Sequence, residues 1–209
     1  GGPIPAVATL LKPKGRAKPG PSKLVSWQSA EDSTAMYCAP SYALQQGSIP
    51  GQLTGSVDSS FEVLQITSLV GAGWSVVIPD HQGPESAFAA GPLAGRITLD
   101  GIRGARDFAP LGLKDDLRVG LMGYSGGAIA THGAAKLAAK YAPDIAGRFV
   151  GAAIGGVPAD YRTLAGAMNA NLASGVFHAA MLGVARERPE VLQMSNHLAR
   201  WLATSEIRN

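Results

Sequence analysis

The sequence predicts an α/β fold with a mostly parallel β-sheet and flanking helices. Short β-rich segments alternate with helix-like segments through the first 158 residues, which is typical of parallel strands joined by right-handed crossovers. A G-x-S-x-G motif at residues 123–127 joins an apolar strand pattern to an alanine-rich helix pattern. From residue 159 onward no strand pattern occurs, and apolar residues recur at helical spacing. We therefore expect an α/β core over residues 1–158, followed by helices over residues 159–209.

The predicted strands are short segments rich in apolar and β-branched residues. They cover residues 6–11, 24–28, 74–78, 118–122 and 149–154. The first two are joined by a stretch in which lysine and arginine alternate with proline and glycine, and we interpret it as a solvated loop.

The first predicted helix covers residues 60–70 and follows the second strand. Ser59 is its expected N-cap, and Glu62 completes a capping box three residues later. Gly71 and Gly73 are expected to end it.

Two more helices follow the third and fourth strands. One covers residues 97–108 and stops before Pro110, and the other covers residues 125–141 and stops before Pro143. Small residues along the second of these allow it to lie close against the sheet.

The G-x-S-x-G motif is predicted to be a nucleophile elbow, with Ser125 on a sharp turn between strand and helix. Gly123 and Gly127 leave room for the neighbouring chains, and Tyr124 lies between the first glycine and the serine. The Gly126 N–H, at the positive end of the helix dipole, is expected to stabilise an oxyanion.

Composition excludes several classes of protein. The chain has 209 residues, of which 46% are apolar and 16% charged, and this balance is typical of a globular protein. The net charge is +3, but the basic stretch lacks the aromatic partners of a nucleic-acid site, so no nucleic-acid partner is expected. No apolar run approaches the roughly 20 residues that span a bilayer, so no transmembrane segment is expected.

Six short motifs resemble those of the secretory lipase family of α/β-hydrolases, which includes the fungal lipase A type enzymes and actinobacterial relatives. They are AEDS at 30–33, CAPSY at 38–42, DHQG at 80–83, LDGIR at 99–103, GYSGG at 123–127 and YAP at 141–143. The motifs occur in the same order along the chain as in the family. The resemblance implies an α/β-hydrolase core over residues 1–158, the start of a helical cap or lid over residues 159–209, and further sheet strands C-terminal to this chain.

The resemblance also implies roles for individual residues. Ser125 corresponds to the nucleophile, and Asp32 corresponds to the second oxyanion residue beside Gly126. Asp32 lies in the loop after the second strand, where this fold places such a donor. An ionised carboxylate would repel an oxyanion, so Asp32 acts either through its backbone N–H or in protonated form. Capping of the next turn is the structural alternative for Asp32.

Other polar residues have simpler interpretations. Asp80 and His81 lie on the active-site edge of the sheet, and we expect them to fix a loop by local hydrogen bonds. His132 is two helical turns from Ser125, so we expect it to be a packed or surface residue.

The remaining members of a Ser-acid-His triad are not evident. Asp160, His178 and His197 satisfy the chain order, but both histidines lie in the predicted cap and no strand precedes either of them. We therefore expect the acid and the histidine C-terminal to Asn209. Cys38 is the only cysteine, so it is either a lone buried thiol or half of a disulfide with a partner outside this chain. The resemblance implies the disulfide, with its partner cysteine in the cap beyond Asn209.

The resemblance implies a secreted serine lipase or carboxylesterase that hydrolyses acylglycerols or related esters through an acyl-enzyme on Ser125. It implies no cofactor and no metal, and its partners are the lipid substrate, a lipid interface touched by the cap, and the remaining C-terminal half of the protein. An acyltransferase using the same elbow, and a catalytically incomplete chain that binds acyl groups, are the alternatives.

Overall fold

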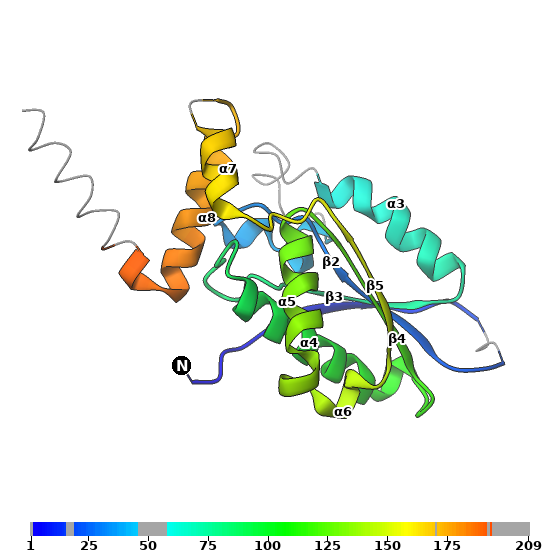
Figure 1. Ribbon diagram of the computed structural model, residues 1–209. Coiled ribbons are helices and arrows are strands. Elements are labelled where there is room, and N and C mark those ends of the chain that lie inside the picture. The colour runs from blue at the N-terminus through cyan, green and yellow to red at the C-terminus, as the bar shows by residue number, and fades with distance from the viewer. Residues whose placement is uncertain (1, 16–18, 46–57, 170, 192, 194–209) are drawn as a thin grey trace, which may run out of the picture.

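The computed structural model describes residues 2–15, 19–45, 58–169, 171–191 and 193, and its elements follow the predicted alternation (Figure 1). Their bounds, in chain order, are β1 (Ala8–Leu11), β2 (Lys23–Gln28), η1 (Met36–Cys38), α1 (Pro40–Ala43), α3 (Asp58–Gly71), β3 (Ser75–Pro79), α4 (Gly91–Asp107), η2 (Ala109–Leu111), β4 (Arg118–Tyr124), α5 (Gly126–Tyr141), α6 (Pro143–Ala146), β5 (Phe149–Gly155), α7 (Tyr161–Met168) and α8 (Ser174–Glu187).

The sheet has the strand order β1-β3-β2-β4-β5. Strands β2, β3, β4 and β5 are parallel, but β1 pairs antiparallel with β3, with Ala8 opposite Pro79. The expectation of parallel crossovers is therefore wrong for the first strand. A parallel connection requires a crossover, usually a helix, and the described part of residues 12–22 contains none.

Helices cover the two faces of the sheet and bury a separate core on each. Figure 1 shows α4 and α5 on one face and α3 on the other. Leu24, Val77 and Leu121 point into the first core, whereas Val25 and Val76 point into the second. Adjacent strand residues thus alternate between two apolar layers, as a sheet buried on both faces requires.

Helices α4 and α5 approach each other at backbone contact. A Cβ added at Gly95 would collide with the Gly133 backbone, and a Cβ added at Gly133 would collide with the Gly91 carbonyl oxygen. The absence of side chains at these crossing points lets the two helices pack more closely than larger residues would permit.

Helix α4 begins at Gly91, six positions earlier than the sequence predicted. Pro92 lies in its first turn, where a fixed φ favours helix and the missing N–H costs nothing. Glycines and proline lower the helix propensity of this stretch, but its packing against α5 outweighs that cost.

Helix α3 begins at Asp58, ahead of the predicted start at residue 60. The side chain of Ser59 lies outside the described residues, so the capping box stays a prediction. Glu62 is buried, and its Oε1 accepts a hydrogen bond from the Ala30 N–H at 2.9 Å. The Glu62 carboxylate therefore holds the loop after β2.

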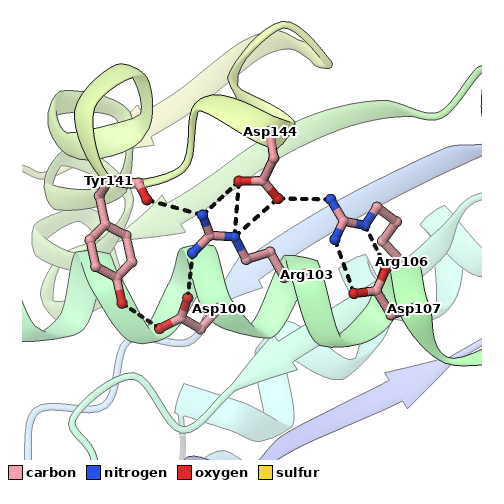
Figure 2. Close-up of polar contacts among 6 residues, drawn as sticks. All are labelled: Asp100, Arg103, Arg106, Asp107, Tyr141 and Asp144. Atoms are coloured by element: carbon pink, nitrogen blue, oxygen red, sulfur yellow. Dashed lines mark hydrogen bonds and ion pairs between the residues drawn. The ribbon is translucent and has the colours of Figure 1, made fainter. Parts of the chain in front are cut away.

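A polar network joins α4 to the junction of α5 and α6 (Figure 2). Asp144 accepts hydrogen bonds from Arg103 Nη2 at 2.6 Å and from Arg106 Nη1 at 2.8 Å. Arg103 also donates to the Tyr141 carbonyl oxygen at 3.0 Å, and the Tyr141 hydroxyl donates to Asp100 at 2.7 Å. Two arginines on successive turns of α4 thus hold the end of α5 and the start of α6.

Helices α7 and α8 lie at the end of the core opposite α6 (Figure 1). Arg186 of α8 donates to the carbonyl oxygens of Thr34 and Ser86 at 2.8 and 2.9 Å, and a Cβ at Gly183 would collide with the Phe88 backbone. This helix pair is the segment expected to begin the cap. In the part of the chain that the structure describes, no helix combines the length and apolar character needed to span a membrane.

Candidate active site

Ser125 lies on a strained turn at the carboxyl end of β4. Its φ of 52° and ψ of −118° are unusual for a residue with a side chain, and it precedes the first residue of α5. The Ser125 N–H donates to the Gly155 carbonyl oxygen at 3.0 Å, so the neighbouring strand helps to hold the turn.

The elbow glycines are required by close backbone approaches. A Cβ added at Gly123 would lie 2.5 Å from the Gly127 carbonyl oxygen, and one added at Gly127 would collide with the Gln28 carbonyl oxygen. Tyr124, in contrast, is exposed, and its ring covers Gly155 and Gly156 at the end of β5.

Asp32, which the family resemblance assigns to the oxyanion site beside Gly126, contacts the serine in the structure. The Ser125 hydroxyl donates to Asp32 Oδ2 at 3.2 Å. A Cβ at Gly126 would collide with Asp32 Oδ1, so the carboxyl group also lies directly over the first residue of α5. The first N–H groups of a helix have no acceptor within the helix. The Ser125 hydroxyl and the Asp32 carboxyl thus meet beside Gly126, the first residue of α5.

Asp80 and His81 fix loops, but not by the local hydrogen bonds that were expected. Asp80 accepts from the Ser41 N–H at 2.8 Å and from the Ser41 hydroxyl at 2.6 Å, and His81 Nε2 bonds the Ser29 carbonyl oxygen at 2.9 Å. Their partners are about 40 and 50 residues away in the chain, because the loops at the carboxyl edge converge from different strands.

Burial and charge set the ionisation of this region. Desolvation, followed by the negative charges of Asp80 and Asp32, raises the pKa of Glu31 well above its usual value. Burial also raises the pKa of Asp80, although its two bonds from Ser41 oppose the shift. Burial lowers the pKa of His81, which favours the neutral ring.

Two of the cavities lined by the described residues open at Ser125. The larger, about 550 Å³, is lined by Ser125, by residues of β2, β4 and β5 that include Trp27, Met122 and Ile154, and by the polar side chains Glu62 and Gln65 of α3. The smaller, about 90 Å³, lies between the elbow and the helices α7 and α8; its lining includes Asp32, Phe88, Ser125, Ile129, Leu164, Met168, Val176 and Phe177. Both present apolar surface to a group bonded to Ser125.

None of the described histidines contacts Ser125. His81 is buried against Ser29, His132 is exposed on α5, and His178 is exposed on α8 with Nδ1 bonded to the Ser174 carbonyl oxygen of its own helix. Asp160 accepts from the N–H groups of Arg162 and Thr163 and is the N-cap of α7. His197 lies outside the described residues. Within those residues, no three His, Cys, Asp or Glu side chains are grouped as metal ligands.

Three contributors to the site were missed in the sequence. Glu31, Ser41 and Gln82 each make a buried or half-buried contact that holds the loops around Asp32. Each belongs to a motif on which the family resemblance rests, AEDS, CAPSY or DHQG. The motifs can be read from the sequence, but which motif contacts which cannot.

Comparison with known proteins finds relatives, and those described below are all lipases. Residues 48–207 match the family model described as secretory lipase. Lipase 10 of Candida albicans is 39% identical over 191 residues, which are 91% of this chain and 40% of that protein. The secreted triacylglycerol lipase LIP5 of Malassezia furfur is 39% identical over 182 residues, 87% of this chain and 46% of that protein. The chain therefore spans less than half the length of these relatives.

A solved structure supports the same assignment. The crystal structure of Candida antarctica lipase A in its closed state aligns with a TM-score of 0.76 and 34% identity, covering 92% of this chain and 43% of that chain. The mixed sheet and flanking helices are those of an α/β-hydrolase. With the family model matching most of its residues, the chain belongs to the secretory lipase family.

Proposed function

We propose that this chain carries the nucleophile and the oxyanion hole of a secreted serine lipase or carboxylesterase. The observation that carries the proposal is the geometry of Ser125, which combines a positive φ at the N-terminus of α5 with a hydroxyl 3.2 Å from Asp32. A strained serine in this position is exposed to substrate while its neighbours surround the developing charge.

The proposed reaction begins with attack of Ser125 Oγ on the carbonyl carbon of an ester. The serine proton passes to a histidine, and the tetrahedral oxyanion is bound by the Gly126 N–H and by Asp32. As the intermediate collapses, the histidine returns its proton to the leaving oxygen, so an alcohol departs and an acyl-enzyme remains. Water then hydrolyses the acyl-enzyme and restores the Ser125 hydroxyl. Asp32 contributes its backbone N–H or a protonated carboxyl, because an ionised carboxylate would oppose the oxyanion.

Apolar surroundings support a lipid ester as the substrate. The small pocket beside Ser125 is lined by Phe88, Ile129, Leu164 and Phe177, and we propose that it receives the acyl chain. The name of LIP5, a secreted triacylglycerol lipase, fits an acylglycerol substrate and secretion. Helices α7 and α8 would begin the cap that touches a lipid interface, with the core ending near residue 158.

We propose that the acid and histidine of the triad lie C-terminal to Asn209. Among the described histidines, His81 and His178 make hydrogen bonds away from Ser125 Oγ: His81 bonds the Ser29 carbonyl oxygen and His178 bonds the Ser174 carbonyl oxygen. Most residues of the edge strand β5 are exposed. Further strands pairing with β5 would bring loops to the same carboxyl edge, which is where this fold carries the acid and the histidine.

The test is labelling and hydrolysis with the full-length protein. A fluorophosphonate should label Ser125, and Ser125→Ala should lose labelling and at least roughly 10³-fold in kcat. The control is Ser68→Ala, which removes an exposed hydroxyl of α3 and should change neither. Labelling that survives Ser125→Ala would refute the proposal, and product analysis with an added alcohol separates hydrolysis from acyl transfer.

A further inference from the structure

The loop between β2 and Asp32 is held at three consecutive residues by side chains from other elements. His81 Nε2 bonds the Ser29 carbonyl oxygen at 2.9 Å, Glu62 Oε1 accepts from the Ala30 N–H at 2.9 Å, and Gln82 Nε2 donates to the Glu31 carbonyl oxygen. Asp32 is the next residue. A loop fixed in this way leaves little freedom to the residue that follows it.

Two of these bonds involve carbonyl oxygens that lie directly against the elbow. A Cβ at Gly127 would lie 2.9 Å from the Ser29 oxygen, and a Cβ at Gly126 would lie 3.2 Å from the Glu31 oxygen. The carbonyl groups that His81 and Gln82 bind are therefore among those that touch the first two residues of α5, beside the Gln28 carbonyl group at Gly127. Any shift of these carbonyl groups changes the spacing between the loop and Ser125.

The chemistry of the two side chains suits a fixed support. His81 is 2% exposed and Gln82 is 3% exposed, so both hydrogen bonds are shielded from water. A carbonyl oxygen can only accept, so Nε2 of His81 carries the proton and one tautomer is selected. Removing the Gln82 amide would take its donor from the buried Glu31 carbonyl oxygen, and removing the His81 ring would leave the Ser29 carbonyl oxygen with only the Glu31 N–H, at 2.8 Å. The loss of either buried hydrogen bond is costly enough to make the loop rearrange.

We infer that His81 and Gln82 are positioning residues for the ester hydrolysis proposed above: together they set the distance between Asp32 and Ser125 through the carbonyl groups of Ser29 and Glu31. Neither side chain lines the two cavities at Ser125, so their effect is on the oxyanion site and not on the binding of the acyl chain. The inference rests on the proposed function.

The experiment compares four variants of the full-length protein on a soluble p-nitrophenyl ester. Gln82→Met and His81→Leu keep approximate size but lose the donor, and each should lower kcat by roughly 10- to 100-fold with KM changed by less than about threefold. His81→Gln offers an amide donor near the position of Nε2 and should recover most of the loss. Ile102→Val, a buried change on α4, is the control for a loss of stability alone, and the Tm of every variant is measured beside its kcat.

The outcomes separate the inference from the proposed function. The positioning role is supported if kcat falls in the two variants that lack the donor and recovers in His81→Gln. The fall must also exceed the change in kcat of Ile102→Val at a similar Tm. An active wild type whose kcat is unchanged in Gln82→Met overturns the inference alone, even if His81→Leu fails to fold. Equal losses in His81→Leu and His81→Gln also overturn it, and an inactive wild type overturns the proposed function with it.

Discussion

Glu31 is a buried acid whose neighbours and surroundings both disfavour its charge. It is 7% exposed, and its raised pKa arises first from desolvation and then from Asp80 and Asp32. Between the unfolded pKa and the higher folded pKa, the folded chain binds more protons than the unfolded chain. Stability from this residue therefore falls as the pH rises through that window and is fully present at lower pH.

Glu31→Gln should stabilise the protein at pH 8, because the amide has nearly the same shape and carries no charge to bury. In a chain of this size, 1 kcal/mol of unfolding free energy corresponds to roughly 2–4 °C in Tm. We expect Tm to rise by at least this amount at pH 8 and to change little at pH 4. Thermal unfolding across this range measures it. Glu190→Gln, at an exposed position, is the control, and an equal gain at both pH values would contradict the account.

At the scale of elements, Asp144 is the acceptor shared by two arginines of α4 (Figure 2). Hydrogen bonds from Arg103 and then from Arg106 lower the pKa of Asp144 well below its usual value. An acid with a depressed folded pKa contributes stability above its unfolded pKa, and that contribution is lost as the pH falls through the folded value.

Asp144→Asn should lower Tm at pH 7 by at most about 2–4 °C, since exposed ion pairs contribute little. The difference from the wild type should shrink below pH 3 and in 1 M salt. Asp115→Asn, at an exposed position near β4, provides the control for loss of one negative charge. A deficit that is constant from pH 2 to 8 would contradict an electrostatic role for Asp144.

Much of the fold could be predicted because its signals are local. The elbow joins a strand to a helix within a few residues, and Ser125 lies where that motif requires. The direction of β1 depends on its pairing with β3, a contact between distant residues that no local pattern encodes. The early start of α4 was missed for a related reason, because its glycines serve the contact with α5.

The six family motifs differ in the same way: each motif is local in the sequence, whereas the contacts between motifs are long-range. AEDS meets GYSGG through Asp32 and Ser125, CAPSY meets DHQG through Ser41 and Asp80, and LDGIR meets YAP through Asp100 and Tyr141. Each motif could be found in the chain, and the resemblance assigned Asp32 to the oxyanion site beside Gly126. The other two pairings, and the role of Gln82, required the tertiary structure.

At the scale of the whole molecule, Arg186 links α8 to the core among the described residues. Its guanidinium donates to the carbonyl oxygens of Thr34, Glu85 and Ser86. Arg186→Met keeps the aliphatic stem and removes these bonds, so protease cleavage between α7 and α8 should become about tenfold faster, corresponding to ~1.4 kcal/mol. Arg162→Met on α7 serves as the control, and an unchanged cleavage rate in Arg186→Met would argue against this link.

Cys38 is expected to connect the core to the cap covalently. It is buried, and the family resemblance implies a partner cysteine C-terminal to Asn209. Such a bridge closes a loop of more than ~170 residues and by chain entropy would contribute roughly 4–5 kcal/mol, so Cys38→Ser should lower Tm and activity in the full-length protein. Thiol titration in denaturant without reductant is the direct measurement, and one free thiol traced to Cys38 would refute the disulfide.

The backbone contact between α4 and α5 also has a consequence for motion. Gly91, Gly95 and Gly133 bring the two helices together without side chains between them. Because the two backbones are in contact, neither helix can unfold locally without disturbing the other. Their amide protons should exchange with deuterium through one shared, rare opening, whereas those of α7 and α8 exchange through more frequent ones. The serine would then be held by the slowest-exchanging part of the molecule, while the helices above it open and close on their own timescale.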